Sequence, residues 1–159
     1  MKWFALAALA GCTGGGPGNT SCGPSSAVVQ RVIDGDTVEL ADGTRVRYLL
    51  MDAPETTLGH NDCFGSNAVE FNTSLVMGKT IDLVYDTQCQ DMYGRTLAYI
   101  SVDGTDVNAT MVQRGYACVL YIPPDGSDRY DEFKMYQADA KANMRGAWGA
   151  CDPLPPACK

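Results

Sequence analysis

Five charged residues lie near the ends of apolar segments, where side chains from separate segments can converge. They are Asp36, Arg47, Asp52, Glu55 and Arg95. Carboxylates together with a backbone carbonyl make a hard oxygen site suited to Ca²⁺ or Mg²⁺. A carboxylate that does not bind the metal can orient a water as general base, and two guanidinium groups can clamp a phosphate. A metal, a base and paired guanidiniums are the components of phosphodiester hydrolysis.

Three of these residues also have an explanation that needs no catalysis. Asp36 follows a hairpin turn and could serve only to close it, and Asp52 could cap the turn that Pro54 enforces. Arg47 could be an exposed strand residue, which is the interpretation that strand alternation favours for Arg45. Taken one at a time, these residues do not establish a site.

The segments that would position the charged residues predict a small, mainly β domain. Alternating or apolar runs, bounded by Asp-Gly and other turn signals, indicate five strands. Their ranges are 27–33, 37–40, 45–51, 79–86 and 94–102. A shorter extended piece is expected at 116–121.

Apolar residues at helical spacing predict three helices. Their ranges are 64–78, 106–115 and 128–145. The first could be capped by Asn67 together with Glu70, and the second by Asp106. The expected buried face of the third consists of Phe133, Tyr136, Ala140 and Met144.

The order of these elements defines the expected fold class. Three strands, a helix, two strands and two helices indicate an α+β protein that is mainly β. Five strands in hairpins with an intervening helix fit a five-stranded OB-fold β-barrel with three helices. The pattern alone gives a five-stranded sheet with helices and does not by itself select the barrel.

The N-terminal residues resemble an export signal. Lys2 precedes the apolar run "WFALAALA", and the ending "LAGC" resembles the lipobox of bacterial lipoproteins. This resemblance implies a lipoprotein signal peptide at 1–11, a lipid anchor at Cys12 and a Gly/Pro/Ser-rich tether over 12–26. An ordinary secretory peptide is the alternative. Both interpretations place the protein outside the cytoplasm, either anchored to the cell envelope (outer membrane or surface) or secreted.

Cysteine and histidine usage agrees with export. Six cysteines remain besides Cys12, an even number that suggests disulfides in an exported chain. No CxxC pair or histidine cluster indicates a zinc site. His60 is the only histidine and is expected in a surface loop, so a Ser-His-Asp or Cys-His mechanism is excluded unless His60 is the base.

The charge balance is unusual for a protein that binds nucleic acid. The chain of 159 residues has the length of one domain and contains 12 basic and 19 acidic residues. Because Lys2 is the only charged residue before Cys12, the remainder has a net charge of −8. A typical nucleic-acid-binding domain is basic. Attraction for phosphate must therefore be local here.

Three stretches resemble the motifs of the staphylococcal nuclease-like (thermonuclease) family in order and approximate spacing. They are "VIDGDTVEL", "RVRYLLMDAPET" and "DMYGRTLAYI". The later segment "VNATMVQRGYACV" and the final helix ending in "GAWG" also resemble the family. The resemblance covers 27–149 as a nuclease domain and implies an OB-fold barrel. Residues 150–159 would form a Pro-rich tail pinned by disulfides.

The family resemblance implies a calcium site. Asp36, Asp52 and the backbone carbonyl of Ala53 would hold Ca²⁺. Asp34 would lie next to these ligands without binding the metal itself. Ala53 replaces a Thr of the type member, a change without consequence if only the carbonyl binds the metal. A carboxylate and carbonyl donor set is the one that Ca²⁺ prefers.

The resemblance also implies roles in catalysis and substrate binding. Glu55 would activate the attacking water, and Arg47 and Arg95 would bind the scissile phosphate and stabilise the transition state. Tyr93 and Tyr121 match positions that contact a terminal phosphate and a base. We therefore expect a monomeric, Ca²⁺-dependent endonuclease that cuts DNA or RNA and leaves 3′-phosphates.

Two departures and one alternative qualify this expectation. Met92 replaces a Lys that touches phosphate, and Pro123 replaces a second Tyr of the nucleotide pocket. With an acidic domain, calcium-free binding to DNA is expected to be weak and to depend little on salt.

The alternative is a non-catalytic OB-fold module for nucleic-acid binding or surface adhesion. Such a module would not need all five charged residues.

The cysteine pairing is predicted from the positions of the loops. Cys63 and Cys89 precede two loops that flank the expected site, so we expect a bond between them. The remaining pairs would then be Cys118 with Cys151 and Cys22 with Cys158.

Overall fold

The structure is a computed structural model that describes residues 22–159. The predicted signal peptide at 1–11, the predicted anchor Cys12 and the first part of the predicted tether lie outside the described residues. The rest of that tether lies against the folded domain. There the Tyr85 hydroxyl donates to the carbonyl of Pro24 at 2.6 Å, and Leu83 donates its backbone N–H to the carbonyl of Ser25 at 2.8 Å.

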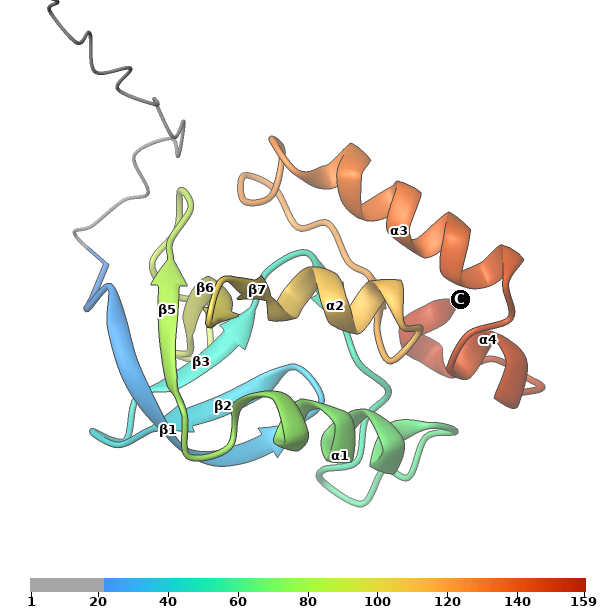
Figure 1. Ribbon diagram of the computed structural model, residues 1–159, viewed down its shortest axis with the longest axis horizontal. Helices are drawn as coiled ribbons and strands as arrows, with labels where there is room; N and C mark the ends of the chain where they lie inside the picture. The colour runs from blue at the N-terminus through green and yellow to red at the C-terminus, as the bar shows by residue number, and fades with distance from the viewer. Residues whose placement is uncertain (1–21) are drawn as a thin grey trace, which may run out of the picture.

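Five strands form a closed barrel, as expected from the sequence (Figure 1). They are β1 (Ser26–Asp34), β2 (Thr37–Leu40), β3 (Arg45–Tyr48), β5 (Thr80–Val84) and β6 (Thr96–Val102). Neighbours are antiparallel in the order β3-β2-β1-β5-β6, and the barrel closes where β3 pairs parallel with β6. The fold is thus mainly β within the α+β class, and the OB-fold prediction is confirmed.

Three short strands lie outside the five-stranded barrel. They are β4 (Met51–Asp52), β7 (Thr105–Asp106) and β8 (Cys118–Val119). β7 extends the edge of β6, and β4 pairs with β8 so that Asp52 lies opposite Cys118. This small second sheet fixes the chain at one of the predicted site residues.

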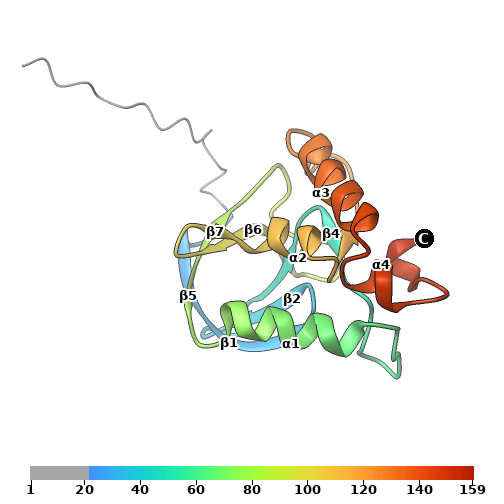
Figure 2. The same ribbon diagram turned by 45° about the vertical axis from the view of Figure 1, so that its right-hand side comes forward.

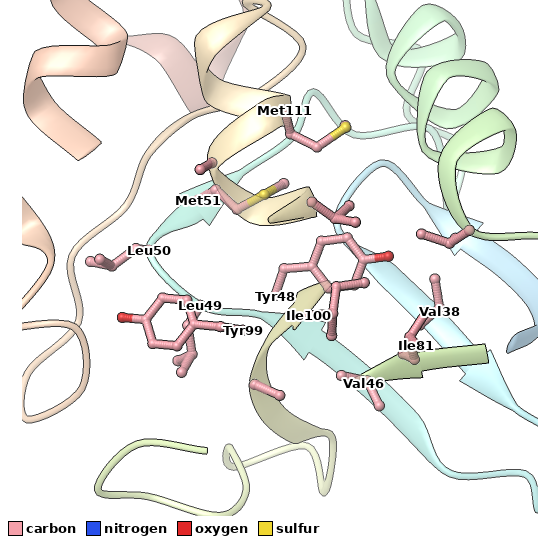
Figure 3. Close-up of a cluster of buried hydrophobic side chains, with 14 of the residues drawn as sticks. Val38, Val46, Tyr48, Leu49, Leu50, Met51, Ile81, Tyr99, Ile100 and Met111 are labelled. Atoms are coloured by element: carbon pink, nitrogen blue, oxygen red, sulfur yellow. The ribbon is translucent and has the colours of Figure 1, made fainter. Parts of the chain in front are cut away.

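The apolar core explains which side chains point outward (Figure 3). Val38 and Leu40 on β2, and Val46 and Tyr48 on β3, are almost completely buried in the barrel. Because side chains alternate along a strand, the intervening residues project from the other face. Those residues include Glu39, Arg45 and Arg47, which are the charged residues of these two strands.

Three main helices cover the barrel, as predicted (Figures 1 and 2). They are α1 (Gly65–Val76), α2 (Val107–Gln113) and α3 (Tyr130–Ala142), followed by the short α4 (Ala147–Ala150) and a 3₁₀ turn at Pro156–Cys158. α1 packs against β1, and α2 lies between β6 and α3. Within residues 22–159, none of the helices has the length and apolar character needed to cross a bilayer.

The helix boundaries test the predicted caps. Asp106 is the N-cap of α2, because its carboxylate accepts the Ala109 N–H at 2.8 Å. The Asn67 cap is wrong, since α1 already begins at Gly65 without a side-chain cap. A Cβ on Gly65 would lie 2.6 Å from the Thr56 Cγ2 atom, so the start of α1 packs directly against the preceding loop.

The buried face of the third helix is only partly as expected. Phe133 and Ala140 are fully buried, and Tyr136 is half-buried. Met144 is exposed because α3 ends at Ala142 and Met144 lies beyond it at a positive φ of 51°.

All three predicted disulfides are wrong. The observed pairs are Cys22–Cys89, Cys63–Cys151 and Cys118–Cys158. The chain folds back after α3, so that α4 lies beside the loop before α1 (Figure 2) and brings Cys151 to Cys63. Cys89 is then available to the N-terminal segment that enters the barrel.

Candidate active site

The third strand is shorter than predicted because the chain curls around an arginine. The guanidinium Nη1 of Arg47 donates to the carbonyl oxygens of Tyr48 at 2.8 Å and Met51 at 2.7 Å. Between them the backbone reverses, and Leu50 takes a positive φ of 60°. The expected strand 45–51 is therefore divided into β3 and β4. This turn places Asp52 next to Arg47.

The hairpin between β1 and β2 is a two-residue turn formed by Gly35 and Asp36, so Asp36 is part of the turn and does not follow it as the sequence pattern predicted. Asp34 pairs with Thr37 across this turn. A Cβ on Gly35 would lie 2.6 Å from the Ala53 Cβ, so glycine is required for the turn to pack against the segment after β4. The Asp36 carboxylate accepts the Ala53 N–H at 3.0 Å and the Thr37 hydroxyl at 2.8 Å. Asp36 thereby joins the two segments that carry the predicted metal ligands.

Arg47 forms ion pairs with both predicted carboxylate ligands. Its Nη2 atom lies 2.6 Å from Asp52 Oδ1 and 3.3 Å from Asp36 Oδ2. The Arg47 side chain is only 10% exposed, as is that of Asp36. The three residues that the sequence placed together are thus in contact, with the guanidinium between the carboxylates.

Glu55 is held by its own loop. Its Oε1 atom accepts the backbone N–H groups of Thr56 at 3.0 Å and Thr57 at 2.7 Å, and also the Thr57 hydroxyl. The backbone N–H of Glu55 donates to Asp62 at 3.1 Å. These contacts occupy one carboxylate oxygen and fix the direction of the other.

The carboxylates of the site influence one another. Burial, followed by a hydrogen bond to Glu55, raises the pKa of Asp34 to about 7. The same hydrogen bond lowers the pKa of Glu55 to about 2. Burial also raises the pKa of Asp52, despite the opposing effect of Arg47. The site therefore concentrates negative charge in a partly desolvated region.

Arg95 is positioned by Asp91, a residue to which the sequence analysis gave no role. Asp91 Oδ1 accepts the backbone N–H groups of Tyr93 at 2.9 Å and Arg95 at 3.0 Å. Its Oδ2 atom accepts from Arg95 Nε at 2.7 Å. An Asp at the start of a tight turn that contains Gly is the sequence signal that identifies this role.

Two cavities meet at these residues. The larger, of about 880 Å³, is lined by Asp34, Asp36, Arg47, Asp52, Glu55, Tyr93 and Arg95 among others. The second, of about 580 Å³, shares Arg47, Asp52, Tyr93 and Arg95 and adds the apolar side chains Leu50, Met51, Leu120 and Ile122. A polar cleft is thus continuous with a largely apolar pocket.

Tyr121 does not line either cavity. Its ring stacks on Tyr130 with 4.7 Å between the centroids, while its neighbours Leu120 and Ile122 line the apolar pocket. The proposed contact between Tyr121 and a base stays a prediction. His60 is exposed in the loop after Glu55, as expected, and does not line either cavity.

Comparison with known proteins relates the chain to one family. The family model described as "Staphylococcal nuclease homologue" matches residues 45–150. The chain belongs to this family. The matched region contains Arg47, Asp52, Glu55 and Arg95, whereas Asp36 precedes it.

Curated relatives of the chain are named as nucleases. Thermonuclease of Staphylococcus intermedius is 34% identical over 129 residues, which are 77% of this chain and 76% of that protein. Endonuclease YncB of Bacillus subtilis (strain 168) is 36% identical over 127 residues, 76% of this chain and 60% of the relative. Endonuclease YhcR of the same organism is 34% identical over 146 residues, 83% of this chain but 12% of the relative. The chain thus spans less than two thirds of the two Bacillus proteins.

The donor set of this nuclease homologue fits a hard divalent cation in its chemistry. Asp36, Asp52 and the adjoining carbonyl of Ala53 offer oxygen ligands, and the crowded carboxylates favour a compensating positive charge. Among residues 22–159, however, His, Cys, Asp and Glu side chains form no group of three or more suited to hold a metal. Two carboxylates would therefore bind the ion, with the carbonyl and waters completing its shell.

Proposed function

We propose that the protein is a Ca²⁺-dependent endonuclease that hydrolyses phosphodiester bonds in DNA or RNA and leaves 3′-phosphates. The observation that carries this proposal is that Arg47, Glu55 and Arg95 line one cavity with two carboxylates suited to a metal. The names of the relatives support phosphodiester hydrolysis. The choice of Ca²⁺ and the position of the cut follow from the resemblance of the three motifs.

Glu55 is the group that accepts a proton from the attacking water. Its Oε1 atom is fixed by the Thr56 and Thr57 donors, which hold the carboxylate at the edge of the cleft. The pKa of Glu55, lowered to about 2 by the hydrogen bond from Asp34, keeps the carboxylate ionised at neutral pH. An ionised carboxylate in a fixed position can accept a proton, although general-base catalysis is most efficient when the pKa of the base lies near the working pH.

The two arginines differ in which N–H groups of the guanidinium are available to bind the phosphate. Arg95 uses Nε to contact Asp91 and has both Nη groups left for phosphate oxygens. Arg47 shares Nη2 between Asp36 and Asp52, so this group becomes free for a phosphate only when those carboxylates gain another positive partner. Ca²⁺ bound by Asp36, Asp52 and the Ala53 carbonyl would supply Lewis-acid polarisation of a phosphoryl oxygen.

The apolar pocket beside the cleft fits a nucleotide base. Leu50, Leu120 and Ile122 line it, and it opens toward Arg47 and Arg95. A base held there would keep its own phosphate at the two guanidiniums. This arrangement relies on apolar contact for affinity, which suits a chain with a net charge of −7.

We further propose that the protein acts outside the cytoplasm as a monomer, anchored through Cys12 or secreted. Three disulfides link residues 67, 88 and 40 positions apart, and such bonds persist in oxidising compartments. Mass spectrometry of the N-terminus of protein extracted from membranes would detect a lipid-modified Cys12. An unmodified, soluble protein would contradict the anchor but not the enzymatic activity.

The direct test of the proposed activity is cleavage of plasmid DNA by the oxidised protein. We expect nicking and then fragmentation in millimolar Ca²⁺, and no cleavage after a chelator is added. End-labelling of the products identifies 3′-phosphates. Plasmid that is bound but left intact in Ca²⁺ would overturn the proposal and support a non-catalytic OB-fold module.

A further inference from the structure

A row of three charged side chains crosses the outside of the barrel next to the cleft. In the strand register, Arg31 on β1 lies opposite Glu39 on β2, and Glu39 lies opposite Arg45 on β3. Arg31 Nη2 donates to Glu39 Oε2 at 2.8 Å, and Arg45 Nε lies 3.7 Å from the same oxygen. The row therefore carries two positive charges and one negative charge.

This row is connected to the active site through β3. Arg45 and Arg47 are two residues apart on one strand, so their side chains share a face and their Cα atoms lie about 6.6 Å apart. Both line the larger cavity. Strand alternation predicts that Arg45 is an exposed strand residue, which it is, but the same alternation also brings it to the cleft that Arg47 enters.

The outer arginines have donors available for a ligand. The Arg31 and Arg45 side chains are 57% and 58% exposed, whereas that of Arg47 is 10% exposed. A guanidinium has five N–H donors, and Glu39 uses few of them. Exposed ion pairs add little to stability, so the fold alone does not explain two arginines around one carboxylate.

The acidic character of the chain makes this position informative. With a net charge of −7, most of the surface repels a nucleic-acid strand, and attraction is confined to places where cations gather. Arg129, by contrast, is held between Asp106 and Glu132 on the helical side of the molecule. A substrate strand that left the cleft in the direction of β2 and β3 would pass Arg45.

We propose that Arg45, supported by Arg31, binds a non-scissile phosphate of the substrate strand, next to the phosphate held by Arg47 and Arg95. This inference rests on the proposed endonuclease function and extends its site along the strand. Arg45 positions the substrate and takes no part in the bond cleavage. The site then favours substrates with at least two consecutive phosphates.

The test compares two single-stranded substrates in fixed Ca²⁺ and salt. One is a hexanucleotide, and the other is a dinucleoside monophosphate that has only the scissile phosphate. For Arg45→Ala we expect KM on the hexanucleotide to rise about fivefold with little change in kcat, because one exposed charge contact is lost. This increase should disappear on the dinucleoside monophosphate. Arg45→Lys should restore most of the affinity, since the positive charge is kept.

Arg114→Ala is the matched control, because Arg114 is exposed at the end of α2 and lines neither cavity. It changes the net charge by the same amount and should leave KM on both substrates at the wild-type value. An equal rise of KM for Arg45→Ala and Arg114→Ala would show that net charge alone causes the effect, and would overturn the inference. An Arg45→Ala variant with wild-type KM on the hexanucleotide would overturn the inference.

Neutral methylphosphonates locate the phosphate. One non-scissile phosphate of the hexanucleotide is replaced at a time. At one position the replacement should raise KM for the wild type and leave KM for Arg45→Ala unchanged.

If the wild type cleaves neither substrate, the proposed function fails, and calcium-free binding followed by fluorescence anisotropy decides the inference separately. Arg45→Ala should then bind the hexanucleotide more weakly, with the slope of log K against log salt reduced by about 0.7. Equal binding and slope would overturn it.

Discussion

The two halves of the cleft are held in place by different forces. The half formed by the barrel carries Asp36 and Arg47, which are buried and have hydrogen-bond partners on β2, β3 and β4. The half formed by loops carries Glu55 and Arg95. It consists of two loop segments, 55–64 and 86–95, in which no residue is fully buried.

The loop half depends on covalent bonds for its position. Cys63–Cys151 ties the loop after Glu55 to the C-terminal segment, and Cys22–Cys89 ties the loop before Arg95 to the start of the barrel. Hydrophobic packing therefore fixes the phosphate and metal ligands, while disulfides and local hydrogen bonds fix the base and the second arginine. Changes in the two halves should accordingly separate stability from activity.

The largest effect is expected for Glu55→Gln in the loop half. The amide oxygen can still accept from Thr56 and Thr57, so the loop keeps its shape, but the group can no longer take a proton. We expect kcat to fall by about 10²- to 10⁴-fold with an unchanged unfolding midpoint. Glu70→Gln, an exposed change on α1, is the control and should retain full activity. A Glu55→Gln enzyme within tenfold of wild type would remove Glu55 from the role of base.

Removal of Cys63–Cys151 should loosen the loop half selectively. The bond closes a loop of 88 residues, so replacing both cysteines by serine should lower the free energy of unfolding by roughly 2–4 kcal/mol. Hydrogen exchange should quicken in the loop 55–64 while Val38 and Val46 in the barrel stay protected. Equal loss of protection in the barrel would show that the two halves are one cooperative unit.

In the barrel half, Tyr48→Phe should affect stability more than activity. The Tyr48 hydroxyl donates to Asn72 at 3.0 Å, and Asn72 donates to the carbonyl of Asp34 at 3.0 Å. The substitution leaves a buried amide oxygen unpaired, so we expect a loss of about 1–2 kcal/mol in chemical denaturation. Tyr136→Phe removes a hydrogen bond to Glu132 on a half-buried side chain and should cost less. The reverse order would contradict the assignment of Tyr48 to a rigid half.

The same division separates the features that could be predicted from the sequence from those that could not. Asp36, Arg47 and Asp52 line one cleft, as the strand pattern and motifs predicted, because Asp36 directly precedes β2, Arg47 lies on the adjacent strand β3, and Asp52 follows the end of β3 by four residues. The disulfides could not be predicted, since Cys151 reaches Cys63 only through the return of the chain after α3. Strand alternation and turns are determined by short stretches of sequence, whereas the packing of distant segments is not.

Details within the site show the same limit. The ion pairs of Arg47 and the break in the third strand depend on where a buried guanidinium finds carbonyl oxygens, which no spacing of residues indicates. The stacking of Tyr121 on Tyr130 depends on how α3 packs, and it turned Tyr121 away from the pocket that its neighbours line.

The smallest effect is expected for Asp91→Asn, which tests how the loop half orders itself. The amide oxygen can still accept the Tyr93 and Arg95 backbone N–H groups, so the turn is kept while the ion pair with Arg95 Nε is lost. Because both side chains are partly exposed, we expect kcat/KM to fall only about fivefold. Asp103→Asn in the turn between β6 and β7 should have no effect. A loss as large as that of Glu55→Gln would mean that Asp91 orders the whole cleft, as barrel contacts do for Arg47.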